Sequence, residues 1–428
     1  MKVKRIIAIL LAAATVLSLA ACSSWDKVNS KATYVYWLNF KPELDDVLQK
    51  LAAEYSKKKG FSVTVKTPEG DYDTALAEEL NSDNPPTMFV LGKRNSVAAF
   101  YNHAADLGKS EIVKLLNVEG NNMYDEKNRL VAIPYCLECF GIAVNPYCLE
   151  VIGHSVDEIK DFDSLKTIVE ELHSNAEWLG CDAFAPIDVT GDSSWKYTAH
   201  LANVEYAYEK RRAAVWDDVP PSLSGEYTDN FKNLYDLVVN NSTAAADKLT
   251  GGHNGLQDFK HGKAAFYLAG SWEFSSIAEE VPDAVMIPYY CGVAGEEKAG
   301  LCVGTENCWA INDNISEESN KATTDFMIWL MSDKKASAAL VKELGPLPYV
   351  KASKTSENTF LNNAQAYEAQ GCYDLPWAFT YQPNTATYRK ELCDALAAYN
   401  ADQSDANWRK VKDAMIDGWM RNYISENE

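Results

Sequence analysis

Short apolar runs alternate with stretches of helical periodicity through the first hundred residues of the chain. The runs are rich in β-prone residues and predict strands at residues 34–38, 61–65 and 87–91. Apolar residues recur every three or four positions between them, from Leu44 to Tyr55 and from Asp73 to Leu80, and Gly60 is placed to end the first helix. Strand, helix, strand order of this kind is typical of a parallel sheet with helical crossovers.

The same alternation continues to the end of the chain. Asp163 is a candidate N-cap for a helix with apolar residues at 165, 168, 169 and 172, and a further helix is expected from Ser194 past Tyr206. Strands are predicted at 264–268 and 308–312, and helices at 322–331, 336–343 and from 385 to about 423. The whole pattern predicts α/β architecture.

The first two dozen residues do not belong to this pattern. Lys2, Lys4 and Arg5 precede an apolar run that ends at Leu19-Ala20-Ala21-Cys22, which is typical of an export signal covering residues 1–21. The quartet resembles the bacterial lipobox, in which the cysteine receives lipid before cleavage, so Cys22 is the expected lipidation site. Residues 22–30 would then be a polar tether. A secreted protein whose cleavage site simply precedes a cysteine is the alternative.

Length and charge narrow the classes of function. A chain of 428 residues with 47% hydrophobic content should form two or three folded cores, and no second apolar run reaches the length of a spanning helix. The formal net charge is −21, so the surface should repel nucleic acid and anionic lipid. We therefore expect no nucleic-acid partner and no membrane attachment besides lipid.

Ten cysteines require an explanation, and nine remain once Cys22 is assigned to lipid. Cys136-Leu-Glu-Cys139 has the form of half a zinc knuckle, but no second such pair exists and the six histidines are scattered. We predict no metal site. The nine are expected to be buried thiols with one or two disulfides, whose pairing the sequence leaves open.

No motif of a known enzyme class is present. The sequence contains no Gly-x-Ser-x-Gly, no His-Glu-x-x-His, no Walker loop and no Gly-x-Gly-x-x-Gly after a strand. Glu138 and Glu273 could serve as the paired carboxylates of a glycosidase, but a chain with 61 acidic residues offers many such pairs. We therefore predict a protein that is not an enzyme and that needs no cofactor.

Aromatic residues beside turn-forming residues are the more informative candidates. Trp37 lies near Asn39, Trp195 near Tyr197, and Trp377 follows a proline, while Trp272 follows Gly270 and Ser271. Aromatic faces suit the C–H faces of sugar rings, and nearby amides and carboxylates suit the hydroxyls. Each aromatic taken alone could equally be a core residue.

Two longer motifs carry a family resemblance. Leu130 to Asn145 contains Pro134 and Glu138 ahead of an apolar strand, and Phe259 to Trp272 has the form Phe-x-x-Gly-x-Ala, apolar strand, Gly-x-Trp. Both are similar to motifs of the extracellular (family 1) solute-binding proteins of carbohydrate ABC importers, in the maltodextrin-binding-like group. With the lipobox, the resemblance covers almost the whole mature chain.

The resemblance implies a two-lobed α/β fold, like that of periplasmic binding proteins, with a ligand cleft between lobes joined by hinge crossings. The expected N-terminal lobe is 31–143 with 310–347, and the C-terminal lobe is 144–309 with 348–428. The crossings are expected near Gly141 to Asn145, Gly304 to Asn312 and Gly345 to Pro348, although the exact boundaries are open.

The resemblance also implies roles for individual residues. Glu138 would accept hydrogen bonds from ligand hydroxyls, and Trp272 and Trp195 would stack on sugar rings. Together with the aromatic and polar candidates, the expected ligand-binding set is Trp37, Asn39, Glu138, Trp195, Trp272, Glu273 and Trp377. The chain departs from the family at Thr87, where an aspartate is usual, and in its turn Lys93-Arg94-Asn95. Whether that cationic turn contacts ligand or is a solvated surface turn is open.

The function implied is that of a lipid-anchored subunit on the extracellular face of a bacterial membrane. A monomer would capture a carbohydrate, in particular an oligosaccharide, by hinge closure and deliver it to the transmembrane subunits of an ABC permease. Two alternatives remain at this stage: the same scaffold carrying a polyamine or peptide, and an anchored glycoside hydrolase. The sugar, its linkage and its chain length are not determined by the sequence.

Overall fold

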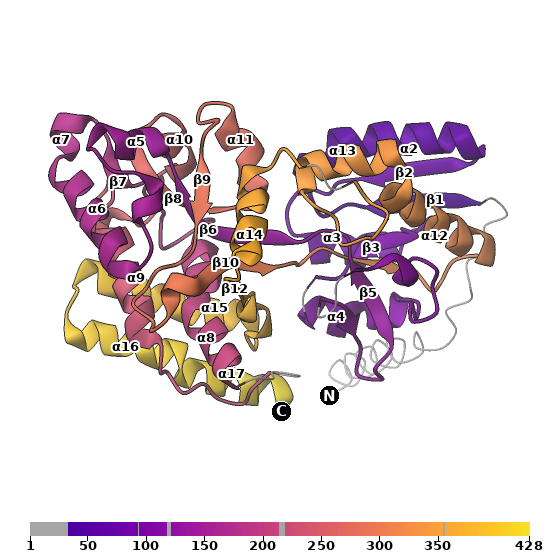
Figure 1. Cartoon of the computed structure of the whole chain (residues 1–428). Helices are drawn as coiled ribbons and strands as arrows, with labels where there is room; N and C mark the ends of the chain where they lie inside the picture. Colours follow the sequence, from indigo (N-terminus) through magenta and orange to yellow (C-terminus); the bar gives the residue numbers. More distant parts are fainter. Residues whose placement is uncertain (1–32, 93, 118–120, 214–218, 354–355) are drawn as a thin grey trace, which may run out of the picture.

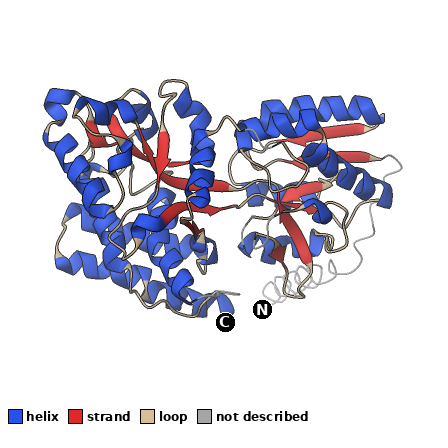
Figure 2. Cartoon of the chain, viewed as in Figure 1, coloured by secondary structure: helices blue, strands red, loops and turns tan. Residues whose placement is uncertain are grey.

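The computed structural model describes residues 33–92, 94–117, 121–213, 219–353 and 356–428, and the export signal and Cys22 lie outside these ranges. The described chain forms two α/β lobes, each built around its own sheet (Figures 1 and 2). The two-lobed α/β fold predicted from the sequence is confirmed. Within the described ranges, no helix combines the length and the apolar character needed to cross a bilayer.

The sheet of the first lobe has the strand order β2-β1-β3-β11-β5-β4. Its strands are β1 (Tyr34–Leu38), β2 (Ser62–Lys66), β3 (Met88–Val90), β4 (Met123–Tyr124), β5 (Leu130–Pro134) and β11 (Cys308–Ile311). β1 pairs in parallel with β2 and β3, whereas β11 runs antiparallel between β3 and β5. A segment far along the sequence thus completes the centre of this sheet.

The helices of the first lobe bury apolar residues in the core that they share with this sheet. They are α2 (Asp45–Lys59), α3 (Tyr72–Leu80), α4 (Arg94–Phe100), α12 (Glu317–Ser332) and α13 (Lys334–Leu344). α2 buries Leu48, Leu51 and Tyr55 and ends at Gly60, whose φ of 79° lies in the left-handed region that favours glycine. The helix and its end were both predicted from the sequence.

The sheet of the second lobe has the order β12-β10-β6-β8-β7, with β9 also paired to β6. Its strands are β6 (Glu138–Val144), β7 (Asp182–Phe184), β8 (Ala264–Gly270), β9 (Val285–Ile287), β10 (Ala299–Gly304) and β12 (Tyr373–Pro376). Every residue of β6 and of β8 is buried. Continuous apolar runs such as these are typical of strands covered on both faces.

Helices surround this second sheet (Figure 1). They are α5 (Pro146–Val151), α6 (Phe162–Ser174), α7 (Ala176–Leu179), α8 (Asn203–Ala213), α9 (Thr228–Asn240), α10 (Gly255–Lys260), α11 (Phe274–Ala278), α14 (Thr359–Ala369), α15 (Thr385–Ala401), α16 (Asp405–Met415) and α17 (Asp417–Asn427). Asp161 caps α6, and not Asp163 as expected, because its carboxylate accepts a hydrogen bond from the Ser164 amide. The predicted C-terminal helical region forms the last three helices.

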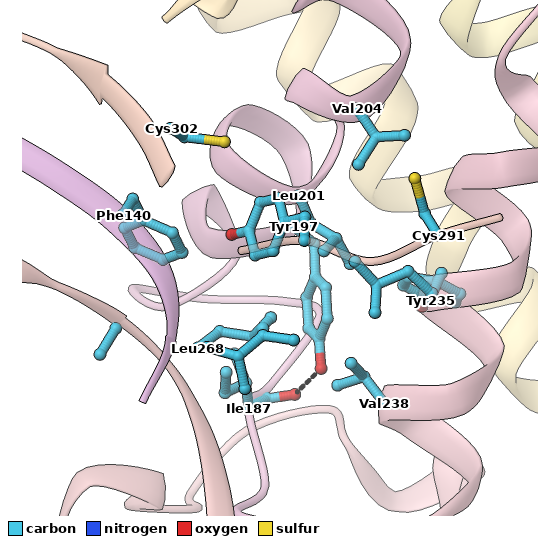
Figure 3. Packing of buried hydrophobic residues seen from close by; sticks show 14 of the residues in the cluster. Phe140, Ile187, Tyr197, Leu201, Val204, Tyr235, Val238, Leu268, Cys291 and Cys302 are labelled. Carbon is cyan, nitrogen blue, oxygen red and sulfur yellow. Dashed lines mark hydrogen bonds between the residues drawn. The ribbon is translucent and has the colours of Figure 1, made fainter. Parts of the chain in front are cut away.

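A π-helical segment, Lys196–Leu201, leads into α8 and contributes to the core of the second lobe. Tyr197 points into that core, where its hydroxyl donates to the Ile187 carbonyl at 3.2 Å and its ring meets Tyr235 edge-on at 5.3 Å (Figure 3). Burial of this aromatic fixes the segment to the sheet.

The two apolar cores show where the chain passes from one lobe to the other. The changes fall between Cys136 and Cys139, between Cys302 and Cys308, and between Ala352 and Phe360. The first boundary lies earlier than residue 143, where it was expected, because β6 pairs with β8 from Phe140 to Val144 and so belongs wholly to the second sheet. The third boundary, in contrast, lies later than the expected residue 347, because Tyr349 packs in the first core and donates to the Pro134 carbonyl.

Candidate functional site

The strand ends of the two sheets define the edges at which the lobes meet. In the first lobe, the parallel strands β1, β2 and β3 end at the same edge, and β11 begins there. In the second lobe β8, β10 and β12 end at one edge, and β6 begins there. Because the connections from β5 to β6 and from β10 to β11 are short and join these edges, the two edges face each other (Figure 1).

A pocket of about 540 Å³ occupies the edge of the first lobe. Its walls come from the loops that follow β1, β2 and β3 and from the connection between β10 and β11: Phe40, Pro42, Thr67, Pro68, Glu69, Gly70, Asp71, Tyr72, Asp73, Val90, Gly92, Ser96 and Glu306. Gly92 is required here, since a Cβ would lie 1.7 Å from the Glu306 carbonyl oxygen. Carboxylates and two aromatic rings make this a polar pocket with an apolar side, suited to hydroxyls or cations.

The edge of the second lobe carries an aromatic wall, formed by Phe140, Trp195, His200, Trp272, Trp377 and Phe379. Trp272 is central, with ring centroids 6.0 Å from Trp195 and 6.2 Å from Trp377. Trp195 and Trp272 are half-buried, whereas Trp377 is 6% exposed. The three predicted tryptophans of this lobe therefore lie together, and two of them keep accessible surface.

Two glycines at strand ends make room for the indoles of the aromatic wall. A Cβ on Gly270 would lie 2.3 Å from the Trp272 ring, and one on Gly304 would lie 2.5 Å from the Trp377 ring. The Trp377 indole also donates to the Cys302 carbonyl at 3.2 Å. Gly304 stands two residues before the pocket-lining Glu306 in the connection from β10 to β11, so the aromatic wall and the pocket lie on the two facing edges.

His200 is buried beside the half-buried indoles of Trp195 and Trp272, and it stacks on Phe140 with 4.0 Å between ring centroids. Burial lowers the pKa of His200 well below its usual value, and the nearby cations Arg389 and Lys196 lower it further, so the ring is neutral. His200 and Phe379 were not predicted from the sequence, because neither stands in a recognisable motif. Both come together with the tryptophans only through the π-helical turn and the loop after β12.

Glu138 lies at the junction of the lobes and has protein partners on both oxygens. Lys41 donates to one at 2.6 Å and Asn307 to the other at 2.6 Å, and the Glu138 residue is 7% exposed. Burial works against the charge of Lys41, but the Glu138 and Glu43 carboxylates outweigh it and raise the pKa of the ammonium. Through the ion pair with Lys41, Glu138 connects the start of β6 to the loop after β1. A contact between Glu138 and ligand remains a prediction.

Glu273 braces the turn that carries Trp272. It accepts hydrogen bonds from the Gly270 amide at 3.0 Å, from the Tyr267 hydroxyl at 3.1 Å and from the Lys196 ammonium at 2.7 Å. Its carboxylate is thus held behind the aromatic wall. Glu273 therefore supports the turn that positions Trp272. A direct contact between Glu273 and solute remains a prediction.

Trp37 and Asn39, also expected at the site, lie in the first lobe away from solvent. Trp37 is 1% exposed and meets Tyr135 and Trp309 edge-on at 5.8 and 5.5 Å. Asn39 is fully buried, and its side-chain amide donates to the Lys41 carbonyl at 2.6 Å. The structure therefore places Trp37 in the core and gives Asn39 a role in shaping the turn after β1.

The remaining expectations concern the cationic turn and metals. Lys93 lies outside the described residues, and Arg94 begins α4 with an exposed side chain. Among the residues that the structure describes, no three histidine, cysteine, aspartate or glutamate side chains are grouped so as to hold a metal ion.

Comparison with known proteins gives this site a context. The family model described as "Bacterial extracellular solute-binding protein" matches residues 50–369. A search among proteins with curated descriptions returned no match.

Solved structures share the fold. RafE from Streptococcus pneumoniae, solved in complex with raffinose, superposes with a TM-score of 0.70 at 13% identity, over 91% of this chain and 99% of that one. A chitin oligosaccharide binding protein gives 0.64 at 15% identity, with the same coverage of both chains. A sugar transporter from Bacillus licheniformis in complex with stachyose gives 0.59 at 17% identity, again with 91% and 99% covered. At these identities the likeness extends to the fold alone.

Proposed function

This chain belongs to the bacterial extracellular solute-binding proteins, and on that premise we propose that its solute is a carbohydrate, in particular an oligosaccharide. The family is one of binding proteins, so the sequence-based prediction of a protein that is not an enzyme is confirmed, and the glycoside hydrolase alternative is set aside.

The observation that carries the proposal is the aromatic wall beside the polar pocket. Trp195 and Trp272 offer two partly accessible indoles side by side, which is more aromatic surface than one small polar solute would use. The carboxylates of the facing pocket supply hydrogen-bond acceptors for sugar hydroxyls. The raffinose, stachyose and chitin oligosaccharide named for proteins of the same fold support this solute class.

A polyamine is the second candidate, and one observation favours it. Four of the residues lining the pocket are acidic, namely Glu69, Asp71, Asp73 and Glu306. A flexible dication could place its ammonium groups among these carboxylates and its methylene chain on the indoles. This alternative predicts affinity that falls steeply with salt, whereas sugar affinity should be nearly independent of salt.

Binding would close the two lobes around the solute. The solute would contact the pocket of the first lobe and the aromatic wall of the second together only in the closed state, and this differential affinity would shift the open–closed equilibrium. We propose that the closed form then docks on the transmembrane subunits of an ABC permease and releases its solute there. The three inter-lobe connections form the hinge.

The test is a solute panel followed by thermal unfolding and calorimetry. Raffinose, stachyose, maltodextrins and chitin oligosaccharides represent the proposed class, and putrescine and spermidine represent the alternative. A true solute at 100 times its Kd should stabilise the folded protein by about 2.7 kcal/mol. Stabilisation by polyamines and by no saccharide would replace the first candidate with the second.

Replacing Trp272 by alanine should weaken solute binding at least tenfold, or roughly 1.4 kcal/mol, because the central indole of the aromatic wall is lost. Calorimetry with the solute identified above measures the effect. Trp178→Ala is the matched control, since Trp178 lies on α7 of the same lobe and is 80% exposed. Equal affinity in the Trp272 variant would remove the aromatic wall from the binding site, and a large fall in the unliganded midpoint would make Trp272 a core residue.

We also propose that lipid on Cys22 holds the protein at the extracellular face of the cell membrane. Two or more acyl chains suffice for stable anchoring, whereas one does not. Cys22→Ser is therefore expected to move the protein from the membrane fraction to the medium and to abolish labelling by radioactive palmitate in cells. Cys393→Ser serves as the control. Unchanged membrane retention of the Cys22 variant would rule out this mode of attachment.

A further inference from the structure

Two cysteine side chains that belong to neither the pocket nor the aromatic wall meet on the second lobe. Cys148 lies in α5 and Cys181 directly precedes β7, and their sulfur atoms are 3.0 Å apart although the residues are separated by 33 positions. We propose that Cys148 and Cys181 form a disulfide bond in the exported protein, a modification that ties α5 to the start of β7.

The local geometry requires only a small movement. A disulfide needs its sulfur atoms about 2.05 Å apart. The two sulfur atoms, now 3.0 Å apart, therefore have to approach each other by about 1 Å. Gly180, with φ of 68°, ends α7 and turns the chain so that the next residue faces α5. The turn at Gly180 therefore places Cys181 next to Cys148.

The other cysteines of the described residues are placed differently. The Cys139 sulfur faces the Met286 sulfur at 3.8 Å, and the Cys393 sulfur faces the Val189 carbonyl at 3.0 Å. Cys136, Cys291, Cys302 and Cys308 are buried and Cys372 is partly exposed, each without a cysteine sulfur within hydrogen-bonding distance in the part of the chain that is described. Among the described cysteines, Cys148 and Cys181 are therefore the pair whose sulfur atoms are in contact.

Access and protonation suit a thiol–disulfide exchange. Cys148 is 6% exposed, whereas Cys181 is partly exposed and can be reached by a small oxidant. The Cys181 thiol donates a hydrogen bond to the Cys148 sulfur, which lowers the pKa of Cys148 and favours its thiolate. Extracellular proteins encounter oxidising conditions in which such pairs persist.

The oxidant is a disulfide, either of a small thiol or of an oxidoreductase. The Cys181 thiol first passes its proton to the Cys148 thiolate and then attacks the oxidant as a thiolate, which forms a mixed disulfide. The leaving thiolate of the oxidant takes the proton from Cys148 and departs as the first thiol. The Cys148 thiolate then attacks the Cys181 sulfur and releases the second thiol. The two protein thiols lose two electrons and two protons in total, and the oxidant disulfide gains them as two thiols.

The bond would act within a single lobe. Cys148 belongs to the apolar core of the second lobe, and Cys181 packs against the same core. The cross-link therefore leaves the hinge between the lobes free. It closes a loop that contains α6 and α7, which restricts the unfolded chain and raises the stability of this lobe.

The test uses the exported protein equilibrated with glutathione disulfide, then blocked with N-ethylmaleimide and mapped by mass spectrometry. We expect one cross-linked pair of peptides containing Cys148 and Cys181, two hydrogen masses below the reduced pair, and a midpoint of unfolding higher by roughly 4 °C or more than after reduction. Alkylation of both cysteines after oxidation, or a cross-link to any other cysteine, would overturn the proposal.

Variants give an independent readout. Cys148→Ser and Cys181→Ser should each lose the difference in midpoint between oxidised and reduced protein. Cys372→Ser, which removes another partly exposed thiol of the second lobe, should keep it. A redox-dependent midpoint that survives in Cys181→Ser would contradict the assignment, and the peptide map of the unaltered protein decides the question even if a variant fails to fold.

Discussion

Lys41→Met is expected to destabilise the folded protein by about 3–5 kcal/mol, since it leaves the Glu138 carboxylate buried without its cationic partner. Both side chains are nearly inaccessible, at 6% and 9% exposure, and their charged atoms are 2.6 Å apart. Glu138→Gln should cost less, because Lys41 keeps its ion pair with Glu43 at 2.7 Å. Urea unfolding followed by far-ultraviolet circular dichroism measures both losses.

The double variant distinguishes the loss of the Lys41–Glu138 ion pair from a general loss of packing in the core. With Lys41→Met and Glu138→Gln together, Glu43 is the one carboxylate that loses its cation, and its side chain is 38% exposed to water. Most of the loss should therefore be recovered, and the coupling should exceed 1 kcal/mol. Lys321→Met is the matched control, since its ion pair with Asp325 is 75% and 41% exposed and should contribute less than 1 kcal/mol. Additive losses in the double variant would contradict a coupled pair at the lobe junction.

Glu205→Gln is expected to stabilise the protein above pH 8 and to leave it unchanged near pH 4. Burial of the Glu205 carboxyl in α8, together with the like charge of Glu209, raises the pKa of Glu205 to about 8. The folded state therefore holds a proton that the unfolded state releases near pH 4.5. The free energy of unfolding therefore falls as pH rises from about 4.5 to 8. The fall is up to roughly 4–5 kcal/mol if the full difference in the pKa of Glu205 between the two states contributes.

Denaturant unfolding at half-unit intervals from pH 4 to pH 9 checks this prediction. The difference between wild type and the Glu205 variant should grow with pH through this window and then level off above pH 8. Glu111→Gln, at a side chain that is 67% exposed, should follow the wild-type curve throughout. Parallel curves for the wild type and Glu205→Gln would mean that Glu205 is ionised in the folded protein.

The fold was largely predictable because its signals are local. The apolar residues of β1, α2 and β8 stand close together in sequence, as short runs in the strands and at helical spacing in α2. Gly60 ends α2 because glycine readily adopts the left-handed backbone conformation. The lobe boundary at β6 was not predictable in the same way. Every residue of β6 is buried, so its composition suits either sheet, and only pairing with β8 assigns it to the second.

The candidate site was predictable in part for a similar reason. Trp272 and Trp377 follow strands that end at one edge, so their motif positions carry spatial information. Trp37, in contrast, packs in the core, although it also lies near the end of a strand and close to the turn-forming Asn39. The Lys41–Glu138 pair joins residues 97 positions apart, and no local pattern indicates such a contact.

The position of β11 has a consequence for how the chain folds. This strand lies between β3 and β5, yet the whole of β6 to β10 precedes it in sequence. The sheet of the first lobe therefore cannot be completed before residues 308–311 are available, and its pairing has high contact order, which slows folding. A chain that emerges N-terminus first leaves the centre of the first sheet open until β6 to β10 have emerged, so β11 couples the completion of the first lobe to the arrival of the second.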